Sequence, residues 1–462
     1  MKLIEKKITK LTFVLFGALG DLALRKLYNS LFTLYKNKLI NNKINILCLA
    51  RKVVKINTFR YKIYKRLIKT KYIYNKKELV TIIKFIKCLY FFNMDFTQIT
   101  HYKILKKIRK NLPLIFYFAV SSNLFKVICK YLNLNKCIEI NDKIILEKPI
   151  GYNFKSSINI NNYINNVFFE TCIFRIDHYL GKRQVKNLLN LRFLNPIFYN
   201  LWTKKYITHI KIILAEKIGI EDRWGYFDKT GQLRDMVQNH LIQILSMVTI
   251  CIPKNNPFDY KNIKKEKIKF LKDLNNSFLT VDINFGQYIS TKLNNKIFNG
   301  YLEENNSNKN SSTETFIIIK TTINNFHWYG IPFILISGKR LKKKLSQIKI
   351  HFTKNIFNYD LNNKLIVNLQ PKEEITFNAF KLNQMSLFLT NKNYLDSYEF
   401  LILEVFKGKQ DLFVSKEEID YSWRWIDKLI YLWKQKNIPI SYYKSFTWGL
   451  TLPGLTPGTY CC

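Results

Sequence analysis

The sequence lacks the patterns that bind structural metals. Its eight cysteines are scattered, no two of them are separated by two residues, and none lies in a tight cluster with histidine. Zinc modules need such ligands at short spacings, so we exclude one and expect no metal. Scattered cysteines in apolar surroundings are typical of reduced thiols, which predicts a cytoplasmic protein. We interpret the closing pair Cys461-Cys462 as an accidental tail rather than a lipidation site.

Long hydrophobic runs are also missing. The longest candidate, residues 241–252, falls short of the roughly 18 apolar residues that a membrane helix needs. The basic start of the chain before Leu11–Phe16 resembles a signal peptide, but this apolar run is short and leads directly into a glycine turn with a charge. We therefore expect a buried first strand and no association with a membrane.

Acidic residues are few. The chain has 32 aspartates and glutamates and 75 lysines and arginines, which gives a formal net charge of +43. A basic excess can indicate binding to nucleic acid or to other anions. Here the lysines are spread along the chain among asparagines and isoleucines, as in residues 41–46, which indicates drift toward A/T-rich codons. We expect no nucleic-acid partner. The alternative is a polycationic binding protein that kept an enzyme fold without its activity, and salt-sensitive RNA binding would identify it.

A chain of 462 residues is too long for one compact core, so its length predicts two or three domains, and the change of pattern after residue 181 favours two. The first third alternates strands and helices, which predicts a parallel, doubly wound sheet in an α/β Rossmann-like domain over residues 1–180. The predicted elements are strands at 11–16, 44–50, 114–120 and 143–146, with helices at 21–36 and from 124 to about 131.

After residue 181 strand-like runs follow one another, which predicts an α+β domain over residues 181–462 with a large antiparallel sheet. The predicted strands are 207–215, 278–287, 314–322 and 333–337. Residues 303–312 and 253–267 are predicted as surface excursions.

A glycine turn between the first strand and the first helix suggests a dinucleotide site. Glycines permit a tight turn and a close backbone approach, and the following helix start offers N–H groups to a pyrophosphate. The predicted contacts are Gly17, Gly20, Asp21 and Leu22. The third glycine of the usual fingerprint is absent, so the turn alone is a weak signal.

Arg51 follows the second predicted strand, where an NAD enzyme usually carries an acidic residue for the ribose hydroxyls. A cation at that edge suits a 2′-phosphate and favours NADP. The alternative is a chance arginine in a very basic chain.

The block at residues 175–182 (RIDHYLGK) combines a carboxylate, an imidazole and a cation, which together suit proton transfer and phosphate binding. This block resembles the signature of the glucose-6-phosphate dehydrogenase family, and similar blocks follow in order along nearly the whole chain. They are residues 147–151 (EKPIG), 221–228 (EDRWGYFD), 235–240 (DMVQNH), 328–333 (WYGIPF) and 338–341 (GKRL), with further similarity at Gln370-Pro371, Tyr398-Glu399 and Trp423.

The resemblance implies oxidation of C1 of D-glucose 6-phosphate to 6-phosphogluconolactone with hydride transfer to NADP, the first step of the pentose phosphate pathway. It implies that His240 is the general base, since a neutral imidazole can take the C1 hydroxyl proton. Asp177 would orient that ring and stabilise the imidazolium. The alternatives are a core-edge histidine on an apolar helix and an aspartate in a structural ion pair.

The resemblance also implies the residues that contact substrate and cofactor. A phosphate clamp would consist of His178, Tyr179 and Lys182, because a cation and hydrogen-bond donors suit a dianion. The remaining implied contacts are Glu216, Asp235, Lys339 and Lys344 toward the substrate, and Lys148 and Pro149 toward the nicotinamide. Any one of the lysines could instead be a solvated surface residue, and the proline could merely end a strand.

Some positions depart from the family pattern. Leu24 replaces a common cation, Ser121-Ser122 replaces a Pro-Pro turn, Arg183 replaces Glu, and Ile336-Ser337 replaces Arg-Thr. None removes a proton-transfer residue, so we expect them to change affinity rather than reaction type. A related dehydrogenase for another hexose phosphate, or for NAD, stays as an alternative. The resemblance implies a homodimer or homotetramer joined through the large-sheet domain.

Overall fold

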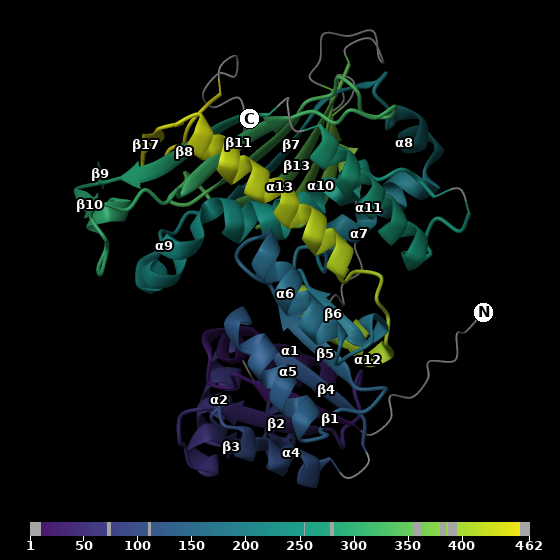
Figure 1. Ribbon diagram of the computed structural model, residues 1–462, viewed down its shortest axis with the longest axis vertical. Coiled ribbons are helices and arrows are strands. Elements are labelled where there is room, and N and C mark those ends of the chain that lie inside the picture. Colours follow the sequence, from purple (N-terminus) through teal and green to yellow (C-terminus); the bar gives the residue numbers. More distant parts are fainter. Residues whose placement is uncertain are drawn as a thin grey trace. The chain divides into compact units, whose positions relative to one another are not determined.

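The computed structural model describes residues 11–71, 75–109, 112–253, 255–277, 281–353, 363–378, 385–386 and 395–452 (Figure 1). The chain forms two compact units. Unit 1 comprises Met1–Gly151, Lys155–Gly181 and Asn393–Lys416, and unit 2 comprises Tyr152–Phe154, Lys182–Lys392 and Glu417–Cys462. The units divide next to the predicted boundary at residue 180, but two segments differ from the predicted domains, because 152–154 belong to unit 2 and 393–416 to unit 1.

Unit 1 contains the predicted parallel sheet, with the strand order β3-β2-β1-β4-β5-β6. Every neighbouring pair is parallel, which confirms the Rossmann-like α/β prediction. All five residues of β1 and of β4 are buried, as expected for strands covered on both faces. The strands are β1 (Thr12–Phe16), β2 (Asn45–Ala50), β3 (Leu89–Asn93), β4 (Leu114–Phe118), β5 (Lys143–Glu147) and β6 (Ile173–Ile176).

Helices cover this sheet, and one of them comes from a distant part of the chain. The predicted helix at 21–36 divides into a π-helical turn, η1 (Ala23–Leu27), and α1 (Tyr28–Lys36). Helix α12 (Ser397–Lys407) packs against α1 in the same core. The other α-helices of unit 1 are α2 (Ile56–Lys71), α3 (Lys76–Lys87), α4 (Lys103–Ile108), α5 (Phe125–Leu134) and α6 (Phe154–Asn165).

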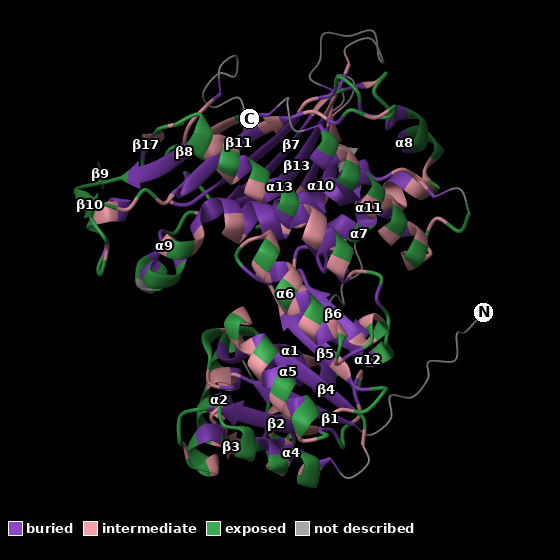
Figure 2. Ribbon diagram, viewed as in Figure 1, coloured by how far each residue is buried: buried purple, intermediate pink, exposed green. Residues whose placement is uncertain are grey.

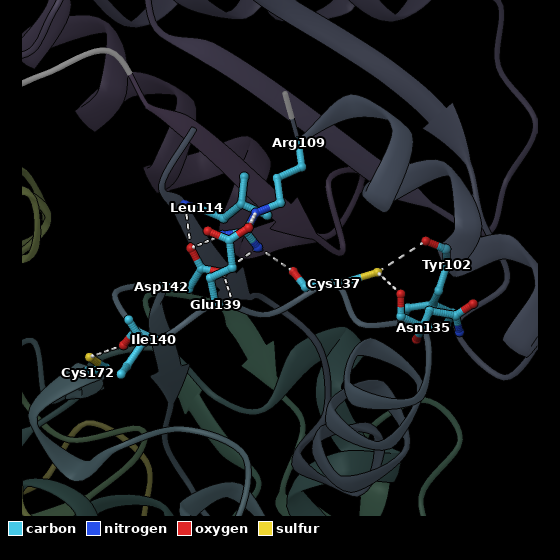
Figure 3. Close-up of polar contacts among 9 residues, drawn as sticks. All are labelled: Tyr102, Arg109, Leu114, Asn135, Cys137, Glu139, Ile140, Asp142 and Cys172. Atoms are coloured by element: carbon cyan, nitrogen blue, oxygen red, sulfur yellow. Dashed lines mark hydrogen bonds and ion pairs between the residues drawn. The ribbon is translucent and has the colours of Figure 1, made fainter. Parts of the chain in front are cut away.

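A buried ion pair joins the amino ends of β4 and β5 (Figure 3). Arg109 Nη1 lies 2.7 Å from Asp142 Oδ2 and also donates to the carbonyl of Cys137 at 2.8 Å. The same carboxylate accepts the backbone N–H groups of Leu114 and Glu139, each at 2.8 Å. Asp142 is 1% exposed, so its hydrogen bonds are made away from water and hold the two strand starts together.

Unit 2 contains a nine-stranded sheet with the order β16-β15-β14-β13-β7-β12-β11-β8-β17. Most pairs are antiparallel, which confirms the predicted α+β domain, but β12 pairs with β7 and β17 with β8 in parallel. The strands are β7 (Ile207–Ala215), β8 (Asp282–Ile289), β11 (Phe316–Thr321), β12 (Phe333–Gly338), β13 (Leu345–Phe352), β14 (Lys364–Gln370), β15 (Glu374–Asn378), β16 (Met385–Ser386) and β17 (Ile440–Lys444), with β9 (Thr291–Leu293) and β10 (Lys296–Phe298) forming a separate hairpin.

The helices of unit 2 form the second layer of that unit. They are α7 (Arg183–Leu194), α8 (Pro196–Leu201), α9 (Trp224–Gln232), η6 (Leu233–Leu241), α10 (Ile242–Thr249), α11 (Tyr260–Asn276) and α13 (Lys416–Gln435). Helix α7 contacts β14, and η6 contacts β7 and β12. Figure 2 shows the strands of this sheet mostly buried, while α13 alternates buried and exposed turns.

Two sequence predictions for unit 2 need correction. The surface excursion predicted at residues 253–267 is wrong in its second half, which forms α11 and buries Ile263 against the unit. The strand predicted at 278–287 begins at Asp282, and residues 278–280 lie outside the described part. Among the described residues, no helix combines the length and apolar character needed to cross a membrane.

Candidate functional site

The glycine turn lies at the carboxyl edge of the parallel sheet, directly after β1. The N–H groups of Gly17 and Ala18 both donate to the carbonyl of Leu49, each at 3.0 Å. Gly17 has φ = +85°, and a Cβ built there would lie 2.3 Å from the carbonyl oxygen of Ala119. Only glycine fits this turn, because a side chain would be strained at this φ and would collide with the backbone after β4.

Arg51 is the first residue after β2, which is the parallel neighbour of β1. Because the carboxyl ends of parallel strands meet at one edge, Arg51 and the glycine turn share that edge. Arg51 is exposed, and its carbonyl accepts the Asn93 side chain at 2.6 Å. Asp21 is exposed and forms a 2.6 Å ion pair with Arg25, whereas Leu22 is partly buried against the core. These residues fit a dinucleotide, since they place a tight turn, a helix start and the exposed guanidinium of Arg51 at one edge of the sheet.

The same edge carries a buried ion pair between the ends of β5 and β6. Lys148 Nζ lies 3.3 Å from Asp177 Oδ2, and the two side chains are 4% and 0% exposed. Asp177 Oδ1 accepts the backbone N–H of Tyr179 at 2.9 Å. Two donors therefore fix the orientation of the Asp177 carboxylate. The structural ion pair that the sequence left as an alternative is present, and it joins two of the predicted site residues.

Glu147 extends this cluster, although the sequence argument gave it no role. Its carboxylate accepts a short hydrogen bond from the Tyr117 hydroxyl. Burial raises the pKa of Glu147, the charge of Asp177 adds to the rise and the hydrogen bonds from Tyr117 and Tyr398 oppose it, so that the resulting pKa is about 7. The sequence could have indicated a role for Glu147, because it is the last residue of a strand and directly precedes Lys148-Pro149.

His178 and Tyr179 follow Asp177 on the loop after β6. The ring of His178 stacks on Tyr398 of α12, with centroids 6.0 Å apart and an interplanar angle of 12°. Tyr179 is 6% exposed. Tyr398 was recognised in a family-like block but was assigned no contact, because its position beside His178 requires α12 to return to unit 1.

Glu216 and Lys339 meet at one edge of the large sheet in unit 2. They follow β7 and β12, which are parallel neighbours with Ala215 opposite Gly338. Lys339 Nζ lies 2.5 Å from Glu216 Oε2, and the two side chains are 6% and 30% exposed. The backbone holds the same arrangement, since the Glu216 N–H donates to the Gly338 carbonyl at 2.9 Å. The structure thus brings together two residues that lie 123 positions apart.

Lys344 lies at this edge too, because it precedes β13, whose first residue Leu345 is opposite Ala215. Lys344 is exposed, so the surface alternative stays open for it. Lys182 is 6% exposed and directly precedes the first residue of α7. The unit boundary falls between Gly181 and Lys182, so the three predicted clamp residues belong to two units.

Asp235 and His240 lie on η6, a nine-residue segment with π-helical geometry. Both side chains are partly exposed, while Val237 and Leu241 are buried. The Asn239 side chain donates to the carbonyl of Asp235 at 3.1 Å and so supports the wide helical turn between the two. π-Helical turns are rare and occur frequently at functional sites.

The departures from the family pattern have individual structural outcomes. Leu24 is buried in the unit 1 core, where a cation would be costly. Arg183 forms a 3.8 Å ion pair with Glu373. Ser121 is exposed after β4, and Ile336 is buried within β12.

The two halves of the chain match two domain families of known proteins. Residues 14–187 match the family described as "Glucose-6-phosphate dehydrogenase, NAD binding domain", and residues 189–452 match "Glucose-6-phosphate dehydrogenase, C-terminal domain". The chain is 42% identical to the glucose-6-phosphate 1-dehydrogenase of Buchnera aphidicola subsp. Schizaphis graminum, with 94% of each chain covered. It is 37% identical to that of Dickeya dadantii, again with 94% of each covered.

Solved structures give the same result. The chain is similar to a glucose-6-phosphate dehydrogenase in complex with its substrate glucose-6-phosphate, with a TM-score of 0.84, 29% identity and 96% of each chain covered. It is also similar to the glucose-6-phosphate 1-dehydrogenase of Mycobacterium avium, with a TM-score of 0.80, 25% identity and 95% of each chain covered.

Proposed function

This chain belongs to the glucose-6-phosphate dehydrogenase family, and on that premise we propose that it oxidises C1 of D-glucose 6-phosphate to 6-phosphogluconolactone and delivers the hydride to NADP. The observation that carries the proposal is that both halves of the chain match the family. A relative with this activity in its name is also 42% identical, and the match covers 94% of its length. It is a dehydrogenase with a dinucleotide-binding domain, as the sequence predicted.

Proton removal is assigned to His240. In this proposal its neutral imidazole takes the proton of the C1 hydroxyl as the hydride leaves C1, which general-base catalysis accelerates by roughly 100- to 10,000-fold. Asp177 orients the ring and stabilises the imidazolium. The two donors on Asp177, Lys148 and the Tyr179 N–H, support this role, because a carboxylate with a fixed orientation aligns its partner without reorganisation.

Substrate binding is assigned to polar residues that the family resemblance implies. The phosphate is held by His178, Tyr179 and Lys182, a histidine, a hydroxyl and a cation. The ion pair of Glu216 and Lys339 supports a role toward the sugar, because it presents an acceptor and a donor side by side. Asp235 and Lys344 complete the proposed substrate contacts.

Cofactor binding is assigned to the carboxyl edge of the parallel sheet. The turn from Gly17 to Gly20, with Asp21 and Leu22, receives the pyrophosphate, and Arg51 receives the 2′-phosphate that distinguishes NADP from NAD. Lys148 and Pro149 border the nicotinamide. When bound, the nicotinamide accepts the hydride from C1.

Assembly and location complete the proposal. We place the enzyme in the cytoplasm, without a nucleic-acid or membrane partner, as a homodimer or homotetramer. None of the six cysteines in the described part forms a disulfide, which supports a reducing compartment. Sedimentation of the purified chain at micromolar concentration should show at least a dimer, and a monomer alone would remove this part of the proposal.

The test is the reduction of NADP by the purified chain, followed by absorbance. Glucose 6-phosphate should support reduction, free glucose should support far less, and NAD should be the poorer acceptor. A preference for another hexose phosphate or for NAD would replace the substrate or cofactor assignment. An inactive chain that binds RNA in a salt-sensitive manner would favour the polycationic alternative.

A further inference from the structure

We infer that Glu314 is a positioning residue for this reaction, because it joins the start of the helix that carries Asp235 and His240 to the turn that carries Lys339. The inference rests on the proposed function and concerns unit 2 alone. Glu314 lies in the segment before β11 and belongs to none of the family-like blocks that the sequence offered.

Glu314 forms hydrogen bonds at the junction of α9 and η6. Its carboxylate oxygen Oε1 accepts the backbone N–H of Leu233 at 2.9 Å, and its backbone carbonyl accepts the N–H of Gln232 at 3.0 Å. N–H groups at a helix start have no partner within the helix, and a negative charge there is favourable. Glu314 is 3% exposed, so these bonds are made out of contact with water.

A glycine beside the helix start leaves room for the Glu314 carboxylate. Gly231, near the end of α9, has φ = 71° and ψ = 169° and breaks the helical conformation just before η6. A Cβ at this position would lie 2.4 Å from Glu314 Oε1 and 2.6 Å from Oε2. Glycine is therefore required both for the backbone conformation and for the approach of the carboxylate.

The neighbouring residue Thr315 makes the connection to the substrate side. Its carbonyl accepts the backbone N–H of Lys339 at 2.9 Å. The Tyr443 hydroxyl lies 3.0 Å from Thr315 Oγ1 and donates to the Lys339 carbonyl at 2.7 Å. Residues 314 and 315 thus hold the start of η6 on one side and the backbone of Lys339 on the other.

A second contact reinforces the same helix start. The Gln232 side chain donates to Ser337 Oγ at 2.7 Å, and Ser337 Oγ donates to the Leu214 carbonyl at 2.9 Å. Ser337 stands where the family resemblance leads us to expect threonine, and it keeps the hydroxyl that this bond needs. The helix start is therefore fixed by side chains from two separate segments, the residues before β11 and strand β12.

The position of Glu314 also makes it sensitive to pH. Burial raises the pKa of Glu314 to about 7, and the Leu233 N–H and the charge of Arg234 oppose that rise. Arg234 lies on η6 itself. Loss of the negative charge below neutral pH weakens the bond at the helix start, so the placement of Asp235 and His240 should depend on this proton.

Three variants test the inference. Glu314→Ala removes the acceptor, and Glu314→Gln keeps an acceptor oxygen without a titratable proton. Asp259→Ala, as a control, removes the acceptor at the start of α11, which carries no proposed site residue. Hydrogen exchange over residues 232–241 reports the helix start. The values of kcat and KM for glucose 6-phosphate with NADP, measured across pH, report the reaction.

We expect Glu314→Ala to accelerate exchange at the start of η6 and to lower kcat by up to about 100-fold, the loss associated with a misplacement of about 1 Å. Glu314→Gln is neutral at every pH, so its kcat should lie up to about threefold below that of the wild type near pH 8 and approach the wild-type value below neutral pH, where Glu314 is protonated. Asp259→Ala should accelerate exchange in α11 and leave kcat unchanged.

The outcomes separate the two claims. An inactive wild-type chain would overturn the proposed function and the inference with it. If the wild type is active and the Glu314→Ala variant keeps both its kcat and the exchange protection of η6, the inference alone is overturned. If Glu314→Ala does not fold, the pH profile of Glu314→Gln decides, and a profile identical to that of the wild type contradicts the inference.

Discussion

Glu314→Gln should change how the stability of unit 2 depends on pH. The folded-state pKa of Glu314 is about 7, against an ordinary value of 4.5, so the folded chain holds a proton that the unfolded chain releases. The stabilisation from this proton is present in full below about pH 4.5 and is lost as the pH rises through about 7.

The magnitude follows from the two pKa values. The difference between about 7 and 4.5 corresponds to about 3 kcal/mol at the acidic limit, at about 1.4 kcal/mol per pH unit. Between about pH 5 and about pH 8 the wild type should therefore lose about 2 to 3 kcal/mol that Glu314→Gln does not lose. Glu314 is 3% exposed, so solvent screening reduces this figure little.

The assay is hydrogen exchange of the slowest amides of unit 2 at the two pH values, corrected for the intrinsic rate, with wild type and variant compared at each. Glu147 also titrates near neutral pH, but it is present in both proteins and cancels in the comparison. A stability difference between wild type and variant that is the same at both pH values would refute the reasoning, because the Glu314 proton would then play no part.

Three further predictions concern proton transfer, cofactor choice and stability. His240→Asn should keep substrate and cofactor binding and lose roughly 100- to 10,000-fold in turnover. Asp177→Asn should also slow turnover severely, and the double variant should be little slower than His240→Asn alone. Losses that multiply in the double variant would show that the two residues act independently. Arg51→Asp should weaken NADP binding far more than NAD binding in a fluorescence titration, and equal losses would mean that Arg51 does not contact the 2′-phosphate. Asp142→Ala should destabilise unit 1 by about 3 kcal/mol in denaturant unfolding, because it removes the buried partner of the Arg109 guanidinium and the acceptor of two backbone N–H groups, and leaves Arg109 only its ion pair with the exposed Glu139. A loss below about 1 kcal/mol would contradict that assignment.

Local patterns predicted the elements well where one strand or turn decides the outcome. The predicted strand 207–215 matches β7 residue for residue, and Arg51 lies at the carboxyl edge because parallel strands end together. The fold class was accessible for the same reason, since alternation of strand and helix along the chain fixes a parallel sheet.

Contacts between distant segments were not accessible. The carboxylate of Glu314 accepts an N–H that lies 81 positions earlier in the chain, and no local spacing encodes that pairing. The π-helical turns of η6 were missed because the apolar spacing of residues 233–248 also fits an ordinary α-helix. The return of α12 to unit 1 was missed because its apolar face is compatible with either core.

The central claim is that this chain removes the hydride from C1 of glucose 6-phosphate and passes it to NADP. The most direct measurement uses substrate that carries deuterium at C1, followed by mass spectrometry of the nucleotide after reduction. The account predicts that the reduced nucleotide gains one deuterium per turnover and that the lactone product retains none at C1. A reduced nucleotide without deuterium, or a lactone that keeps the label, would contradict it.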